Sequence, residues 1–177
     1  YQAIYFIDQT PEHEMVAQRA FDRLVFGYLL IDEYDELVQH MDDSETSLFD
    51  AKLLNGLRGW AKQFGLYLKR LEDDRFLVLC NQAALDVLEK DKFKALEAVK
   101  DGNANQSIPV SISLGIAYSE DTHYNVDELA NQAQLNVELA LARGGDQAVV
   151  RTYNGQARFY GGKLNVNQNR SITRSKM

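Results

Sequence analysis

Two short runs of acidic residues are the part of this 177-residue sequence best suited to chemistry. Asp32 follows the apolar run 25–31 and opens the first run, which continues to Glu36; the second run is 72–74, which ends at Asp74. Carboxylates that converge from a strand end and a turn can hold Mg²⁺ or Mn²⁺ against nucleotide phosphates, because these hard cations take oxygen ligands. We therefore predict Asp32 and Asp74 as metal ligands. The alternative is that both runs are solvated turns, which a chain with 26 Asp and Glu residues can contain without any ligand.

The other reactive residue types favour structural roles. Arg143-Gly144-Gly145-Asp146 resembles a phosphate-binding loop, but it lacks the Lys-Ser/Thr of a P-loop and follows a helix instead of preceding one, so we predict a helix stop. Arg143 itself could reach a phosphate or merely complement the helix dipole. Cys80 closes an apolar strand with no histidine or cationic group fixed near it in sequence, which favours packing over a nucleophilic role. Trp60, on an apolar helix face, is predicted to lie in the core.

Alternating strand and helix patterns must position these residues. The run 25–31 is apolar throughout, as in a central strand buried on both faces. Asn154-Gly155 is a strong hairpin signal. In chain order, the predicted elements are strand 25–31, helix 44–64, strands 66–71 and 76–80, helix 83–99, strand 110–118, helix 126–142, and strands 148–152 and 157–160. This order describes an α+β sandwich in which helices pack on one mostly antiparallel sheet.

Composition limits the class of protein. With 45% hydrophobic residues, 10% aromatic residues and two prolines, the chain is globular and long enough to bury a core without a metal or disulfide. One cysteine and three histidines exclude a disulfide framework and a multi-Cys zinc site, and they disfavour a histidine metal cluster. No apolar run approaches the roughly 20 residues that a bilayer span needs. We expect a soluble, cytoplasmic piece that makes no membrane contact.

The two ends of the chain differ from its body. Residues 151–177 carry a charge of +6 with no acid, so the net charge of −7 leaves −13 on residues 1–150. Because an acidic body repels a nucleic-acid backbone, we predict a solvated linker or docking segment at the basic end and no nucleic-acid partner. Residues 1–8 have a strand composition, and Thr10-Pro11 is typical of a helix start. Without a nearby partner strand, residues 1–24 are predicted to be the remnant of a neighbouring domain and a linker helix.

Three stretches of the sequence resemble the signature segments of GGDEF (diguanylate cyclase) domains. They are Leu30-Ile31-Asp32, Lys69 to Leu79 (KRLEDDRFLVL) and Val110 to Ala117 (VSISLGIA). The order and spacing of these stretches agree with that family over residues 25–152. The resemblance implies an α+β sandwich of the nucleotidyl-cyclase palm type.

A narrower resemblance is to the degenerate GGDEF domain of GdpP/YybT-type cyclic-di-AMP phosphodiesterases. It rests on Asp32-Glu33-Tyr34-Asp35-Glu36, Arg143-Gly144-Gly145-Asp146-Gln147 and Phe159-Tyr160-Gly161-Gly162-Lys163. Proteins of that family consist of membrane helices, a PAS domain, the degenerate GGDEF domain and a DHH phosphodiesterase domain. By this resemblance, residues 1–24 are the end of a PAS domain and its linker helix, and residues 25–152 are the degenerate GGDEF domain. Residues 153–177 are then a terminal hairpin and a basic linker toward the DHH domain.

The sequence departs from an intact diguanylate cyclase at the positions that bind substrate. The Gly-Gly pair that lets a nucleotide approach the hairpin backbone is replaced by Glu72 and Asp73. Asp74 matches the metal-binding acid of the family, but Arg75 replaces the glutamate that follows it. Tyr34 replaces a second acid near the end of the first strand. The resemblance therefore implies a domain that is inactive as a diguanylate cyclase.

The resemblance to cyclic-di-AMP phosphodiesterases then implies a regulatory role for this domain. The full protein would hydrolyse cyclic-di-AMP to linear pApA with Mn²⁺ in its DHH domain, and it would lie at the cell membrane with this domain facing the cytoplasm. Asp32 and Asp74 remain as a weak Mg²⁺ or Mn²⁺ site, with Glu72, Asp73 and Arg143 as candidate nucleotide contacts. Two alternatives stay open: a weak metal-dependent nucleotide (ATP) hydrolase or nucleotide sensor, and a purely structural module that forms a homodimer or docks on the PAS and DHH domains.

Overall fold

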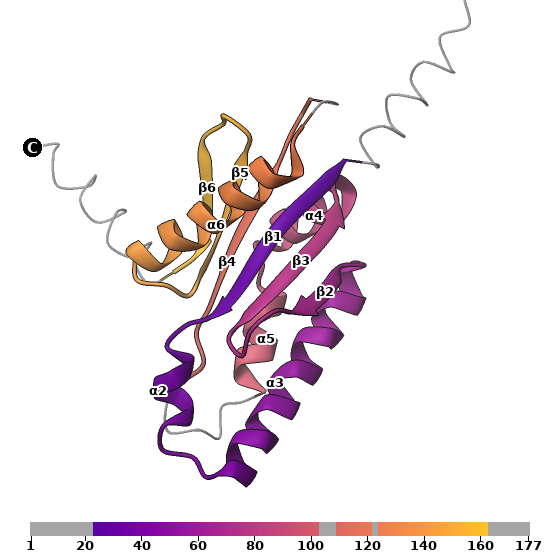
Figure 1. Cartoon of the computed structure of the whole chain (residues 1–177). Coiled ribbons are helices and arrows are strands. Elements are labelled where there is room, and N and C mark those ends of the chain that lie inside the picture. Colours follow the sequence, from indigo (N-terminus) through magenta and orange to yellow (C-terminus); the bar gives the residue numbers. More distant parts are fainter. Residues whose placement is uncertain (1–22, 103–108, 122–123, 163–177) are drawn as a thin grey trace, which may run out of the picture.

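The structure is a computed structural model that describes residues 23–102, 109–121 and 124–162 (Figure 1). The strand and helix predicted near the start of the chain fall almost wholly outside the described residues, as does the predicted basic linker from residue 163 onward. The elements are β1 (Leu24–Ile31), α2 (Tyr34–Val38), α3 (Asp43–Phe64), β2 (Tyr67–Arg70), β3 (Arg75–Asn81), α4 (Gln82–Asp91), α5 (Ala95–Asp101), β4 (Ile112–Tyr118), α6 (Val126–Ala142), β5 (Gln147–Thr152) and β6 (Ala157–Gly161). None of the described helices is long and apolar enough to cross a membrane.

The six strands form one sheet in the order β2-β3-β1-β4-β5-β6, with β1 near its centre. β1 pairs antiparallel with β3 on one side and with β4 on the other. β2 and β3 form an antiparallel hairpin, as do β5 and β6 around Asn154-Gly155. β4 and β5 pair in parallel, because α6 returns the chain between them. The predicted mostly antiparallel α+β sheet and its last hairpin are confirmed.

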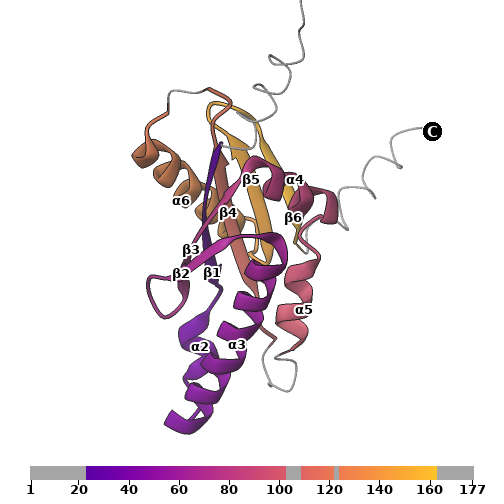
Figure 2. The same cartoon turned by 90° about the vertical axis from the view of Figure 1, so that its right-hand side faces the viewer.

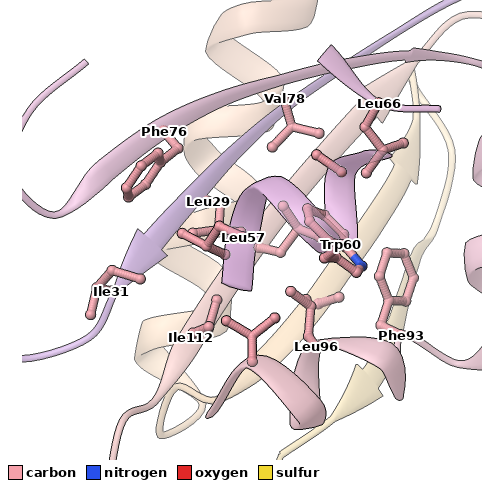
Figure 3. Close-up of a cluster of buried hydrophobic side chains, with 14 of the residues drawn as sticks. Leu29, Ile31, Leu57, Trp60, Leu66, Phe76, Val78, Phe93, Leu96 and Ile112 are labelled. Carbon is pink, nitrogen blue, oxygen red and sulfur yellow. The ribbon is translucent and has the colours of Figure 1, made fainter. Parts of the chain in front are cut away.

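Helices cover both faces of this sheet (Figure 2). α3, α4 and α5 pack on one face and α6 packs on the other. The larger core lies between the sheet and α3, where Leu57 and Trp60 meet Leu29 and other strand residues (Figure 3). Cys80 packs against the same core, and burial raises the pKa of its thiol to about 12. Both Trp60 and Cys80 therefore have the packing environment that the sequence predicted.

α6 lies in close contact with β4. A Cβ atom added to Gly115 would lie 2.3 Å from the carbonyl oxygen of Ala133, a distance that no side chain can occupy. Asn136, fully buried on α6, donates from Nδ2 to the Ile116 carbonyl oxygen at 2.8 Å. This contact fixes the position of α6 on the sheet, and hence the position of the turn that follows α6.

Two helical details differ from the prediction. The helix predicted over 83–99 is two helices, α4 and α5, because Lys92 and Phe93 both have φ of 57°. The break lets the buried Phe93 ring approach the Tyr160 ring, with 5.3 Å between centroids, and this packing outweighs the strain of a left-handed backbone. The short helix α2 was not predicted; it follows Glu33, whose φ is 54°, and it buries Tyr34.

Candidate functional site

The acidic ends of β1 and of the β2–β3 hairpin lie side by side. The Ile31 N–H donates to the Asp74 carbonyl oxygen at 2.8 Å, which holds the hairpin turn next to Asp32. A pocket of about 540 Å³ opens at this junction, and we call it the acidic pocket. It is lined by Leu30, Ile31, Asp32, Glu33, Tyr34, Asp35, Glu36, Asp74, Ser111, Leu141, Gly144 and Gly145. The structure therefore brings Asp32 and Asp74, the two predicted metal ligands, to one pocket.

Asp32 is the buried member of this pocket, with only 8% of its surface exposed. Its Oδ2 accepts hydrogen bonds from the Ser113 hydroxyl at 3.0 Å and from the Asp146 N–H at 2.9 Å. Its Oδ1 is buried and has no hydrogen-bond partner among the described residues. Burial raises the pKa of Asp32, although its two hydrogen bonds oppose that rise. The fold thus holds Oδ2 of Asp32 through two donors from distant segments of the chain.

The turn after α6 forms one wall of the pocket. Gly144 and Gly145 have φ of 101° and 69°, and the Gly145 N–H bonds back to the Ala140 carbonyl oxygen at 3.0 Å. The predicted helix stop is therefore confirmed. A Cβ on Gly145 would lie 2.6 Å from Asp32 Oδ2, so glycine is needed here both for its conformation and for its size.

Lys100 holds the far side of this turn. Its Nζ lies 2.6 Å from Asp146 Oδ1 and 2.7 Å from a Glu97 carboxylate oxygen. The side chain of Lys100 is only 11% exposed, so its charge is engaged within the fold. The sequence analysis did not find this contact, because nothing local signals a pair 46 residues apart.

Arg70 fixes the opposite wall, the β2–β3 turn. Its guanidinium donates to the carbonyl oxygens of Glu72 at 3.2 Å and Asp73 at 2.6 Å, and to Asp50 Oδ2 on α3 at 3.3 Å. Asp50 in turn accepts a hydrogen bond from the Tyr34 hydroxyl at 2.8 Å. Burial and the Asp50 carboxylate raise the pKa of Tyr34 to about 12, so this hydroxyl keeps its proton at neutral pH. The turn is therefore held to both α2 and α3 by one polar network that the sequence analysis missed.

The three predicted nucleotide contacts are not among the residues that line the acidic pocket. Glu72 and Asp73 have exposed side chains at the tip of the turn. The Arg143 guanidinium carbon lies 4.2 Å from the centroid of the Phe159 ring on β6, in a cation–π contact. Nucleotide binding by these three residues stays a prediction.

The charge of the pocket is strongly negative. Five of its lining residues are Asp or Glu, and none of the described residues that line it is Lys or Arg. Such a site attracts cations and repels phosphate groups, because no described side chain in it can neutralise them.

Comparison with known proteins assigns the family. The family model described as "Cyclic-di-AMP phosphodiesterase GdpP-like, GGDEF domain" matches residues 29–159. The chain belongs to this family. Over 98% of its length, this GGDEF domain is 36% identical to the cyclic-di-AMP phosphodiesterase PdeA of Listeria monocytogenes and to the cyclic-di-AMP phosphodiesterase GdpP of Geobacillus thermodenitrificans. It spans 26% of the length of each of these relatives.

The fold of this GGDEF domain is shared with active cyclases. It matches the active GGEEF domain of a diguanylate cyclase from Vibrio cholerae with a TM-score of 0.59 and 10% identity. The match covers 78% of this chain and 89% of that chain. At this identity the likeness shows the fold alone, and it confirms the predicted palm-like sandwich.

Asp32 and Asp74, the two predicted metal ligands, both line the acidic pocket, and metal binding by them stays a prediction. In the described part of the chain, no group of three or more His, Cys, Asp or Glu side chains is arranged to hold a metal ion. A cation bound by Asp32 and Asp74 would take its remaining oxygen ligands from water or phosphate, as Mg²⁺ commonly does.

Proposed function

We propose that this GGDEF domain is the regulatory part of a membrane-anchored enzyme that hydrolyses cyclic-di-AMP to linear pApA, and that it has no diguanylate cyclase activity. The relatives that carry the phosphodiesterase name are about four times as long as the matched segment, since the chain spans 26% of each. The resemblance supplies the PAS domain, the Mn²⁺-dependent DHH domain and the membrane helices as neighbours of this domain.

The observation that carries this proposal is the charge of the acidic pocket. A cyclase domain must hold the triphosphate of GTP, whereas this pocket presents five carboxylates and no cationic side chain from the described residues. The hairpin turn adds the exposed Glu72 and Asp73 to the same end of the sheet. Like charges at these short distances disfavour a nucleotide that arrives without bound cations.

Two assays test the proposal. The chain incubated with GTP and Mg²⁺ is expected to form no cyclic-di-GMP. In the full-length protein, Asp74→Lys is expected to change the rate of cyclic-di-AMP hydrolysis, while the control Asp127→Lys, at the opposite end of the sheet, leaves the rate unchanged. Formation of cyclic-di-GMP, or equal rates for both variants and the wild type, would contradict the proposal.

A second candidate function is metal-dependent nucleotide binding with slow hydrolysis of ATP. It is favoured by one observation: Asp32 and Asp74 line the same pocket. Mg²⁺ or Mn²⁺ would supply positive charge for the phosphates and an activated water. Asp32 and Asp74 would hold the cation. Loss of ATP turnover in Asp74→Ala with unchanged folding would support this function, and unchanged turnover would refute it.

A further inference from the structure

α6 covers only part of the sheet face on which it packs. It contacts β1, β4 and β5 (Figure 1), whereas α3 and α4 contact β2 and β3 from the opposite face. The register aligns Phe26, Leu79 and Tyr67 in a row across β1, β3 and β2. Phe26 is 9% exposed, Leu79 is half-buried and Tyr67 is 56% exposed, so burial decreases with each strand away from α6. By pairing and strand alternation, this side of β2 and β3 carries Tyr67, Lys69, Arg75, Leu77 and Leu79, which we call the bare face.

Two cations of the bare face have no ionic partner. Lys69 is exposed and Arg75 is half-buried, and neither forms an ion pair with a carboxylate of the described residues. The apolar side chains beside them, Leu77 and Leu79, are only half-buried. A surface that is both apolar and cationic is complementary to one that is apolar and acidic.

The outer side of α6 is a surface of that kind. α6 contains no Lys or Arg, and its Leu135 and Leu141 are 55% and 40% exposed. Glu138 is also exposed, and it forms no ion pair with a cation of the described residues. Because α6 packs on β1, the neighbour of β3, this surface and the bare face lie side by side. Each molecule thus carries both halves of a self-complementary interface, as a two-fold dimer requires.

Glu138 and Lys69 lie at the same height along the strands. The register from β2 to β4 places Lys69 level with Gly115. A Cβ on Gly115 would lie 2.4 Å from the Val137 N atom, so α6 passes Gly115 at the residue before Glu138. A two-fold axis parallel to the strands keeps this height while it places α6 of one copy over the bare face of the other. Glu138 of one copy then faces Lys69 of the other.

We propose that two copies of this domain form a two-fold dimer in which α6 of each copy packs on the bare face of the other, with Glu138 facing Lys69. This packing removes the exposed leucines of α6 and the Tyr67 ring from water. It also pairs charges that have no ionic partner within the described part of one chain. The inference goes beyond the proposed function, because it assigns a surface and a symmetry to self-association.

The test is sedimentation equilibrium of the whole 177-residue chain, which is expected to show dimers. Lys69→Glu and Glu138→Lys each place like charges opposite one another in both halves of the interface. Each variant alone should therefore raise the dimer dissociation constant at least about tenfold. A one-to-one mixture of the two variants should restore the dimer, because each half of the mixed interface then joins opposite charges.

Lys62→Glu is the matched control. Lys62 is exposed in the last turn of α3, on the other face of the sheet, so the same charge reversal there should leave the dimer unchanged. All three substituted side chains are exposed, and circular dichroism should show native folding for every variant. The proposal is overturned if the wild-type chain stays monomeric or if Lys62→Glu weakens the dimer as much as Lys69→Glu does. It is also overturned if the mixture of the two interface variants stays monomeric.

Discussion

Gly145→Ala tests whether the Asp32 carboxylate is held as rigidly as the structure indicates. An alanine Cβ at this position would lie 2.6 Å from Asp32 Oδ2, the oxygen that accepts hydrogen bonds from Ser113 and from the Asp146 N–H. The backbone strain at φ of 69° costs about 1 kcal/mol. Displacing the carboxylate also forfeits a hydrogen bond to a charged group, so we expect a total loss of about 3 kcal/mol of unfolding free energy.

Gly65→Ala is the matched control for that variant. Gly65 has nearly the same φ, 67°, but a Cβ there would meet nothing within 4 Å. Gly65→Ala should therefore lower the unfolding free energy only by the backbone strain, about 1 kcal/mol. Urea denaturation followed by circular dichroism measures both losses. Equal losses for the two variants would refute the reasoning, because the carboxylate would then move aside at no cost.

Three further predictions concern packing and titration. Gly115→Ala should destabilise the domain by about 3 kcal/mol in urea denaturation, the upper end for overpacking, because α6 must move away from β4. Because burial raises the pKa of Asp32 above its ordinary 3.8, its contribution to stability is fully present below pH 3.8 and is lost as pH rises through the folded-state pKa. Asp32→Asn should flatten this part of the stability–pH curve, and an unchanged curve would contradict the assignment. Cys80, with a pKa of about 12, should react with a thiol reagent at pH 8 far more slowly in the folded than in the urea-unfolded chain.

The elements with strong local patterns could be predicted from the sequence. The apolar run 25–31, the helical spacing of 126–142 and the Asn154-Gly155 turn each depend on neighbouring residues, and the structure contains all three elements. The break at Phe93 could not be predicted in the same way. It exists because a ring from this position packs against Tyr160 on β6, a contact that no local pattern contains.

The same limit applies to the site. The acidic runs predicted which carboxylates line the pocket on the condition that the first strand lies beside the hairpin, and the pairing of β1 with β3 meets that condition. The contacts that hold the two walls of the pocket join residues distant in sequence: Ser113 is 81 residues from Asp32, and Arg70 is 20 residues from Asp50. Side-chain pairs of this separation follow from the packed fold and not from sequence spacing.

Thermal unfolding of the chain with GTP or ATP, in EDTA and then with Mn²⁺, tests most directly whether the pocket binds cations and repels bare phosphates. A ligand at a hundred times its dissociation constant stabilises the native state by about 2.7 kcal/mol, which such a melt resolves. We predict no stabilisation by either nucleotide in EDTA, and a shift with Mn²⁺ that Asp74→Asn removes. Stabilisation by a nucleotide without metal would contradict the account, because it would require cationic groups that the described pocket does not contain.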